Sequence, residues 1–93
     1  MGKEELIQKL KSEGFPHVYE WTDAPGTEYS AHAHTGAVSM YILKGGLTFW
    51  FGEEVVSLTA GDRFDVPIGK AHTAKVGEDG CTFLVGEMIE GDS

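Results

Sequence analysis

Glycine and proline divide most of this chain into short segments. From Val18 onward, runs rich in valine, tyrosine, phenylalanine, threonine and tryptophan are interrupted by glycine or proline about every eight to twelve residues. That spacing is typical of an all-β sandwich or barrel. Closure into a barrel or jelly roll would remove most of the exposed strand edges. The predicted strands are 17–21, 28–34, 38–44, 47–51, 54–58, 62–66, 71–76 and 81–89.

One short helix is predicted ahead of the strands. Leu6, Ile7 and Leu10 recur at helical spacing, glutamates stand near the start of this segment, and lysines stand near its end, as the helix dipole prefers. Gly14 is suited to ending the helix. The 93 residues suffice for one domain but not for two separate cores. We therefore expect a single domain over 1–93, with a helix at about 3–13 bracing a barrel at about 17–89.

Charge and composition exclude several classes of function. The chain has fifteen acidic and seven basic residues, for a net charge of -8, which disfavours nucleic acid and anionic membranes as partners. No apolar run is long enough to span a bilayer, and the N-terminus has charges where a signal peptide needs an apolar stretch, so we expect a cytoplasmic protein. Cys81 is the single cysteine, so a metal would be held by nitrogen and oxygen.

The histidines are the strongest indication of a functional site. His32 and His34 are one residue apart in a predicted strand, and alternate residues of a strand share a face, so the two imidazoles lie side by side. His72 follows two predicted turns and begins another strand. These residues are either the ligands of a metal ion or structural histidines of a strand surface.

Two motifs of fixed spacing contain these histidines. The first is a glycine, five residues and His-x-His, with a closing glycine further on; its positions are Gly26, His32, His34 and either Gly45 or Gly46. The second is a glycine, five residues, Pro-x-Gly, two residues and a histidine; its positions are Gly61, Pro67, Gly69 and His72. Both motifs resemble those of the cupins, and with their flanks they cover about residues 20 to 85.

The resemblance implies a cupin-type double-stranded β-helix, or jelly-roll barrel, in which His32, His34 and His72 bind one divalent metal. The first motif is degenerate, because Val38 and Ser39 stand where a metal-binding glutamate is expected four or five residues after His34. Val76 likewise replaces the asparagine that often closes the second motif. The fourth ligand is then Ser39, Glu28 or water.

A three-histidine site leaves coordination positions open for a small-molecule ligand. Imidazole suits Zn, Fe, Ni and Cu, and the metal, Mn included, is not selected by the sequence. The resemblance to cupins implies a metal-dependent dioxygenase or related small-molecule enzyme. The alternatives are a non-catalytic module that binds a small ligand or metal, and a structural protein with relic histidines. Without the glutamate the protein adds no charge to the metal, which favours an anionic substrate.

Which residues of the strand at 38–44 face the interior is ambiguous. Either Ser39, Tyr41 and Leu43 point inward, or Met40 and Ile42 do, because both sets are largely apolar. In the first case Tyr41 could donate a hydrogen bond to a metal-bound ligand, which makes it the candidate catalytic residue. We expect Phe49 and Phe64 to line the cavity with it. The aromatic run at 49–51 also suggests an apolar surface that a homodimer would cover.

Overall fold

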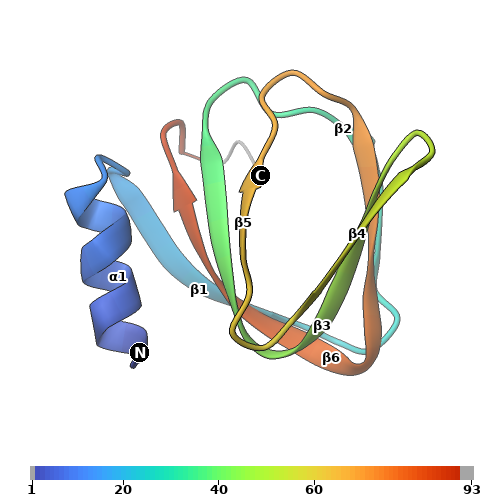
Figure 1. The fold of residues 1–93 in the computed structure, drawn as a ribbon, viewed down its shortest axis with the longest axis horizontal. Coiled ribbons are helices and arrows are strands. Elements are labelled where there is room, and N and C mark those ends of the chain that lie inside the picture. Colours follow the sequence, from blue (N-terminus) through green and yellow to red (C-terminus); the bar gives the residue numbers. More distant parts are fainter. Residues whose placement is uncertain (1, 91–93) are drawn as a thin grey trace.

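The computed structural model describes residues 2–90 and has the predicted architecture, a barrel of β-strands with one short helix outside it (Figure 1). Within that range no helix has the length and apolar character that a bilayer crossing requires. The elements are α1 (Lys3–Ser12), β1 (His17–Asp23), β2 (Glu28–His32), β3 (Val38–Phe51), β4 (Glu54–Thr59), β5 (Arg63–Val66) and β6 (His72–Glu87).

Two long strands, β3 and β6, form the frame of the barrel. They pair with each other antiparallel, β1 and β2 add to β6, and β4 and β5 add to β3. The first half of β3 pairs with β5 and with the end of β6, whereas its second half pairs with β4 and with the beginning of β6. Segments far apart in the sequence therefore meet around one interior.

The prediction of eight strands is wrong at two boundaries, since residues 2–90 form six. The glycine-containing stretches at 44–46 and 77–80 are bends inside β3 and β6, where the pairing register shifts. Gly45 has a φ of 80°, and a Cβ there would overlap the carbonyl oxygen of Gly80 on the paired strand. Glycine permits both the left-handed backbone and the close approach, so the strand bends without ending.

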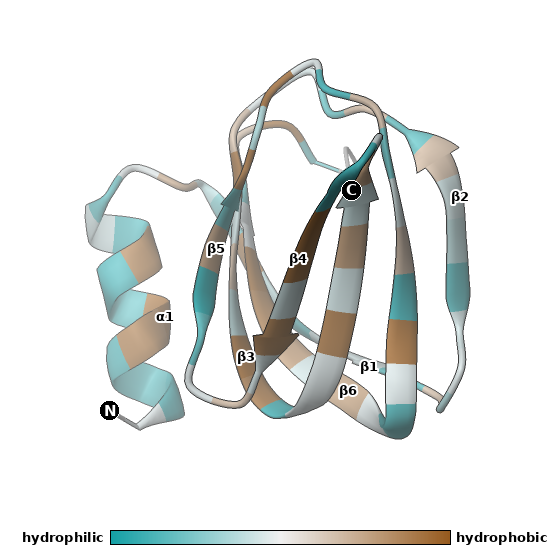
Figure 2. Ribbon diagram, turned by 45° about the vertical axis from the view of Figure 1, so that its right-hand side comes forward, coloured by the Kyte–Doolittle hydropathy of each residue, from teal (hydrophilic) through white to brown (hydrophobic). Residues whose placement is uncertain are grey.

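Alternation along β3 separates two apolar cores. Val38, Met40 and Ile42 belong to the main core inside the barrel. Tyr41 points to the opposite face and packs with Leu84 in a second cluster beneath α1. Bands of alternating hydropathy are visible along the strands in Figure 2. The ambiguity left by the sequence is thus resolved, with Met40 and Ile42 facing inward.

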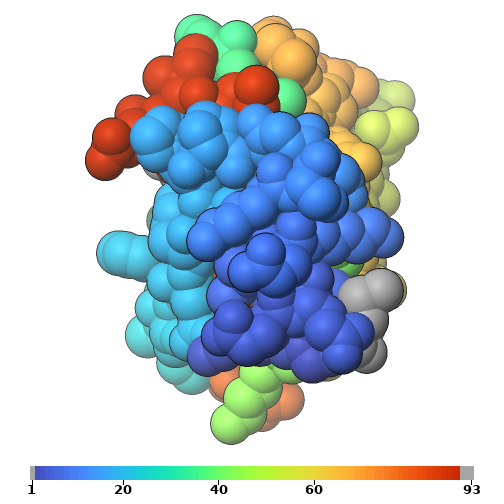
Figure 3. All heavy atoms as spheres, turned by 90° about the vertical axis from the view of Figure 1, so that its left-hand side faces the viewer, coloured from blue at the N-terminus to red at the C-terminus, as the bar shows by residue number. Residues whose placement is uncertain are grey.

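The helix is fixed to the barrel by apolar contacts and by one charged network. Leu10 is fully buried against the second cluster, and Figure 3 shows α1 covering this side of the barrel. Arg63 on β5 donates two hydrogen bonds to Glu13 at the end of α1, at 2.6 and 2.8 Å, and a third to the hydroxyl of Tyr41 at 2.8 Å. It also donates to Asp65 at 3.1 Å. The end of α1 is therefore bound to the sheet by bidentate pairing.

Candidate metal centre

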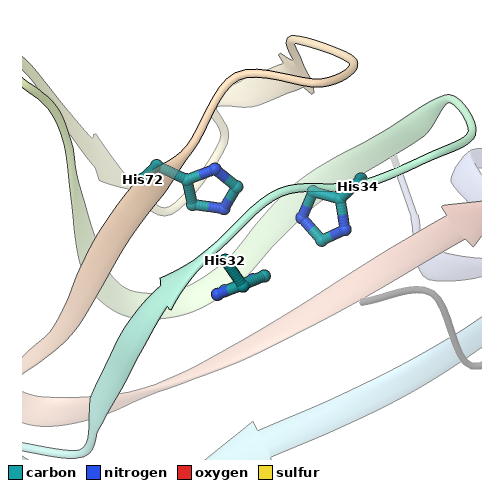
Figure 4. Close-up of side chains that lie close together, drawn as sticks. All are labelled: His32, His34 and His72. Carbon is teal, nitrogen blue, oxygen red and sulfur yellow. The ribbon is translucent and has the colours of Figure 1, made fainter.

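Three imidazoles meet at one end of the barrel interior. His32 is the last residue of β2, His34 follows in the adjoining loop, and His72 is the first residue of β6. Their ring centroids are 4.5 to 5.1 Å apart, and one nitrogen of each ring lies within 4.8 Å of the others. Figure 4 shows the three side chains pointing toward one another. The structure thus brings together the three histidines that the two motifs single out.

Strand pairing explains this convergence. His32 and His72 are direct partners in the antiparallel pair of β2 and β6, so their side chains share a face. The turn before His72 is tied to the loop of His34, because the amide of Gly69 donates to the carbonyl of His34 at 2.9 Å. The predicted strand 28–34 ends two residues early, at His32, and it is this loop that directs His34 to the other two rings.

Backbone hydrogen bonds select the tautomer of two of the rings. Nδ1 of His32 lies 2.8 Å from the carbonyl oxygen of Ser30, and Nδ1 of His72 lies 3.1 Å from that of Lys70. A carbonyl oxygen only accepts, so each Nδ1 carries a proton, and the lone pair of the uncharged form of each ring lies on Nε2. A backbone carbonyl on the second ring nitrogen is the usual arrangement around a metal-ligating histidine.

His72 has the environment of a metal ligand. The residue is 3% exposed, and its Nε2 has no hydrogen-bond partner among residues 2–90. Burial lowers the pKa of His72, the neighbouring rings of His32 and His34 lower it further, and the hydrogen bond to Lys70 acts against them. The neutral ring that results is the form that binds a metal. A buried polar atom without a partner calls for an explanation, and a metal ion bound there would supply one.

The donor set fits a divalent transition metal. Zn²⁺ binds histidine nitrogen at about 2.0–2.1 Å, which places tetrahedral ligands roughly 3.4 Å apart. The three nitrogens already lie within 4.8 Å of one another, so each pair is at most about 1.4 Å wider than that spacing. Three ligands leave at least one position open for water or another ligand.

The histidines line a cavity of about 820 Å³ that occupies the barrel. Its walls are largely apolar, with Val38, Met40, Leu47, Phe49, Phe83 and Val85 among them. Of residues 2–90, no lysine or arginine lines it, but Asp23, Glu87 and Glu90 do. The volume is in the range of small-molecule sites.

Three residues weighed in the sequence as site members do not lie at the histidines. Tyr41, the candidate catalytic residue, faces the second cluster and accepts a hydrogen bond from Arg63, so we correct that placement. Ser39 shares its face and donates to Asp65 at 2.6 Å. Glu28 is exposed and lies 3.8 Å from the ammonium group of Lys75. Neither Ser39 nor Glu28 supplies a fourth ligand in this arrangement.

The expected aromatic lining is partly met. Phe49 lines the cavity, and its ring lies 5.5 Å from that of His72. Phe64 packs behind it, with ring centroids 5.2 Å apart. His17, which carries no motif signal, also lies on the cavity wall. Cys81 is a buried core residue, and burial raises the pKa of its thiol to about 11.

Sequence reasoning missed the buried carboxylate of this cavity. Glu87 is 1% exposed and lines the wall at the end of β6. Phe83, Val85 and Glu87 are alternate residues of β6 and therefore share a face. Had Phe83 been assigned to the interior, Glu87 would have been assigned there too. Because both faces of this strand carry apolar residues, the sequence does not show which face points inward.

Comparison with known proteins places these features in context. The model of the family described as "Cupin domain" matches residues 19–86. No curated protein gave a significant match. A cupin-2 domain containing protein from Shewanella frigidimarina has a similar fold, with a TM-score of 0.64 and 19% identity over 73% of this chain and 65% of that one. The chain thus spans just under two thirds of that protein's length.

Two further structures extend the comparison. A protein with a double-stranded β-helix domain from Klebsiella pneumoniae has a TM-score of 0.66 and 25% identity, over 82% of this chain and 69% of that one. Bacillus subtilis oxalate decarboxylase, described with Mn(II) centres, has a TM-score of 0.69 and 23% identity. The match covers 82% of this chain but 22% of the decarboxylase, so that likeness bears on the fold alone.

Proposed function

The chain belongs to the cupin domain family, and on that premise we propose that its three clustered histidines hold one divalent transition metal for use on a small molecule. The buried Nε2 of His72 is the observation that carries the proposal. The other nitrogen of this ring, Nδ1, is hydrogen-bonded to the carbonyl of Lys70. The imidazoles of His32 and His34 lie next to the ring. A metal bound there would present its open coordination positions to the cavity.

The metal is one that accepts imidazole nitrogen. Zn, Fe, Ni, Cu and Mn all remain candidates, because geometry and availability select among them more than raw affinity does. The Mn(II) centres of oxalate decarboxylase belong to that enzyme, and they support only the general use of such barrels as metal sites.

The cavity favours a ligand with an apolar body that is neutral or cationic. Its walls are mainly aliphatic and aromatic, and its charged lining residues among 2–90 are acidic. A carboxylate-bearing substrate, expected from three neutral ligands alone, would meet these acidic groups without a lysine or arginine to bind it. The lining therefore argues against that earlier expectation.

The reaction class we propose is oxidation of this small molecule by a metal-dependent dioxygenase or a related enzyme. A second candidate, a non-catalytic module that binds a small ligand, is favoured by one observation: Tyr41 lies outside the cavity. Oxygen uptake separates the two. Fe(II)-loaded protein should consume oxygen in step with an apolar substrate if it is a dioxygenase, and should bind the compound without oxygen uptake if it is a module.

Metal binding itself is tested by calorimetric titration with Zn²⁺. The parent should bind one equivalent, and His72→Ala should lose most of the affinity because a ligand is removed. Thr73→Ala is the matched control, since Thr73 is the exposed neighbour of His72 on β6 and lies outside the cluster of three. Equal loss in both variants would show that the effect is not specific to the cluster. A parent that binds no metal would contradict the proposal.

A further inference from the structure

Glu87 is the last inward-facing residue of β6. Phe83, Val85 and Glu87 line the cavity at alternate positions. The residues between them face outward, because Leu84 packs beneath α1 and a Cβ at Gly86 would meet the ring of Phe15 at 3.0 Å. With 1% of its surface exposed, Glu87 is held within the barrel.

Strand pairing places Glu87 next to a position at which the first motif would carry its glutamate. Glu87 is the direct antiparallel partner of Val38 on β3. Val38 is four residues after His34, one of the two positions at which the first motif would carry its glutamate, and it faces the same cavity. Directly opposed residues have Cβ atoms about 4.5–5.5 Å apart. A carboxylate missing from β3 is therefore present one strand away, on the same face.

The charge balance of the site gives this carboxylate a role. Three neutral imidazoles add no charge to offset a divalent cation. The cavity is largely apolar, so a negative charge in it acts on the cation with less screening than a surface charge would. Among residues 2–90, Glu87 is the one carboxylate on the cavity wall that is almost fully buried; Asp23 is partly exposed and Glu90 is exposed.

We propose that Glu87 supplies, from β6, the negative charge that the degenerate motif no longer supplies from β3, and that it thereby strengthens metal binding at the three histidines. This inference rests on the proposed function. The carboxylate is not part of the group of ligand atoms lying within 4.8 Å of one another, so Glu87 acts on the cation by its charge, across the cavity, and not as a ligand.

The test compares Zn²⁺ affinities by calorimetry with a competing chelator. Glu87→Gln keeps the shape and removes the charge, and its affinity should fall about tenfold, because a charge that attracts the cation across the cavity is lost. Glu78→Gln is the control, an exposed glutamate on the same strand, and should match the parent. The exchange Val38→Glu with Glu87→Val moves the carboxylate back to β3 and should restore the affinity lost in Glu87→Gln.

The outcomes separate this inference from the proposed function. A parent that binds Zn²⁺ and a folded Glu87→Gln that binds it equally well would overturn the role of Glu87 and leave the metal site intact. A parent that binds no metal would overturn both. Should Glu87→Gln fail to fold, the exchange variant decides: affinity like that of the parent supports the inference, and loss of affinity in a folded exchange variant contradicts it.

Discussion

At the scale of single residues, spacing alone located the histidines but not their surroundings. Three histidines could be identified as site residues from the sequence: His32, His34 and His72. The spacing of the two motifs identifies them without any knowledge of which face of each strand points inward. Tyr41 and Glu87 depend on which face of a strand is inward, and β3 and β6 are apolar on both faces, one toward the barrel and one toward α1. Periodicity cannot decide between two buried faces.

Gly45 should be far less replaceable than Gly52. Both have a left-handed backbone, with φ of 80° and 63°, but a Cβ at Gly52 meets nothing within 4 Å, whereas at Gly45 it overlaps the backbone of Gly80. Gly52→Ala should then cost only backbone strain, about 1–2 kcal/mol. Gly45→Ala should cost more than about 4 kcal/mol. Urea denaturation measures both, and equal losses would argue against close approach at the bend.

Cys81 should be unreactive in the folded protein. Burial raises the pKa of its thiol to about 11, so the thiolate that reacts is scarce at pH 8. Labelling with iodoacetamide should be slow in the native protein and fast once urea unfolds it. Rapid native labelling would contradict the buried position of this residue.

At the scale of elements, the breaks between strands were the main source of error. The sequence places a strand end at every glycine-containing stretch, yet 44–46 and 77–80 only bend β3 and β6. A glycine that ends a strand and one that lets it bend have the same local signal, and only the partner strand distinguishes them. The helix was easier to predict, because its apolar stripe and charge pattern are local.

The contact of α1 with the barrel should contribute measurably to stability. Leu10 is fully buried against Tyr41 and Leu84, so Leu10→Ala should lower the free energy of unfolding by about 2–5 kcal/mol. Lys11→Ala is the control, since Lys11 is the exposed neighbour on the same helix. Thermal and urea unfolding would measure both. If the two variants lost equally little, α1 would not be part of the folded core.

The network around Arg63 should weaken in acid. The hydrogen bond from Arg63 lowers the pKa of Glu13, and hydrogen bonds from Ser39 and then Arg63 lower that of Asp65. A carboxylate with a lowered folded-state pKa stabilises the fold above its unfolded pKa, about 4, and loses that contribution as the pH falls through its folded value. Stability should therefore drop below about pH 4.

The variant Arg63→Met isolates that contribution. It removes the cation that pairs with Glu13 and Asp65, so its stability should depend less on pH below about 4 than that of the parent. Urea unfolding at a series of pH values gives the comparison. Parallel curves for parent and variant would show that the network does not contribute to folding.

At the scale of the whole molecule, the predicted all-β barrel with an N-terminal helix is confirmed. It could be predicted because the frequent glycines and the two motifs constrain the fold even where single strand boundaries are wrong. The shape and charge of the cavity could not be predicted, since its lining comes from positions whose inward or outward direction the sequence leaves open. The homodimer and the cytoplasmic location stay predictions.

The central claim is that one metal ion binds where the three imidazoles converge, and anomalous diffraction from crystals of metal-loaded protein tests it most directly. We expect a single peak about 2.0–2.1 Å from one nitrogen of each ring, with Nε2 as the ligand in His32 and His72, because their Nδ1 atoms face backbone carbonyls. No peak at the cluster, or a peak bound by other residues, would contradict the account.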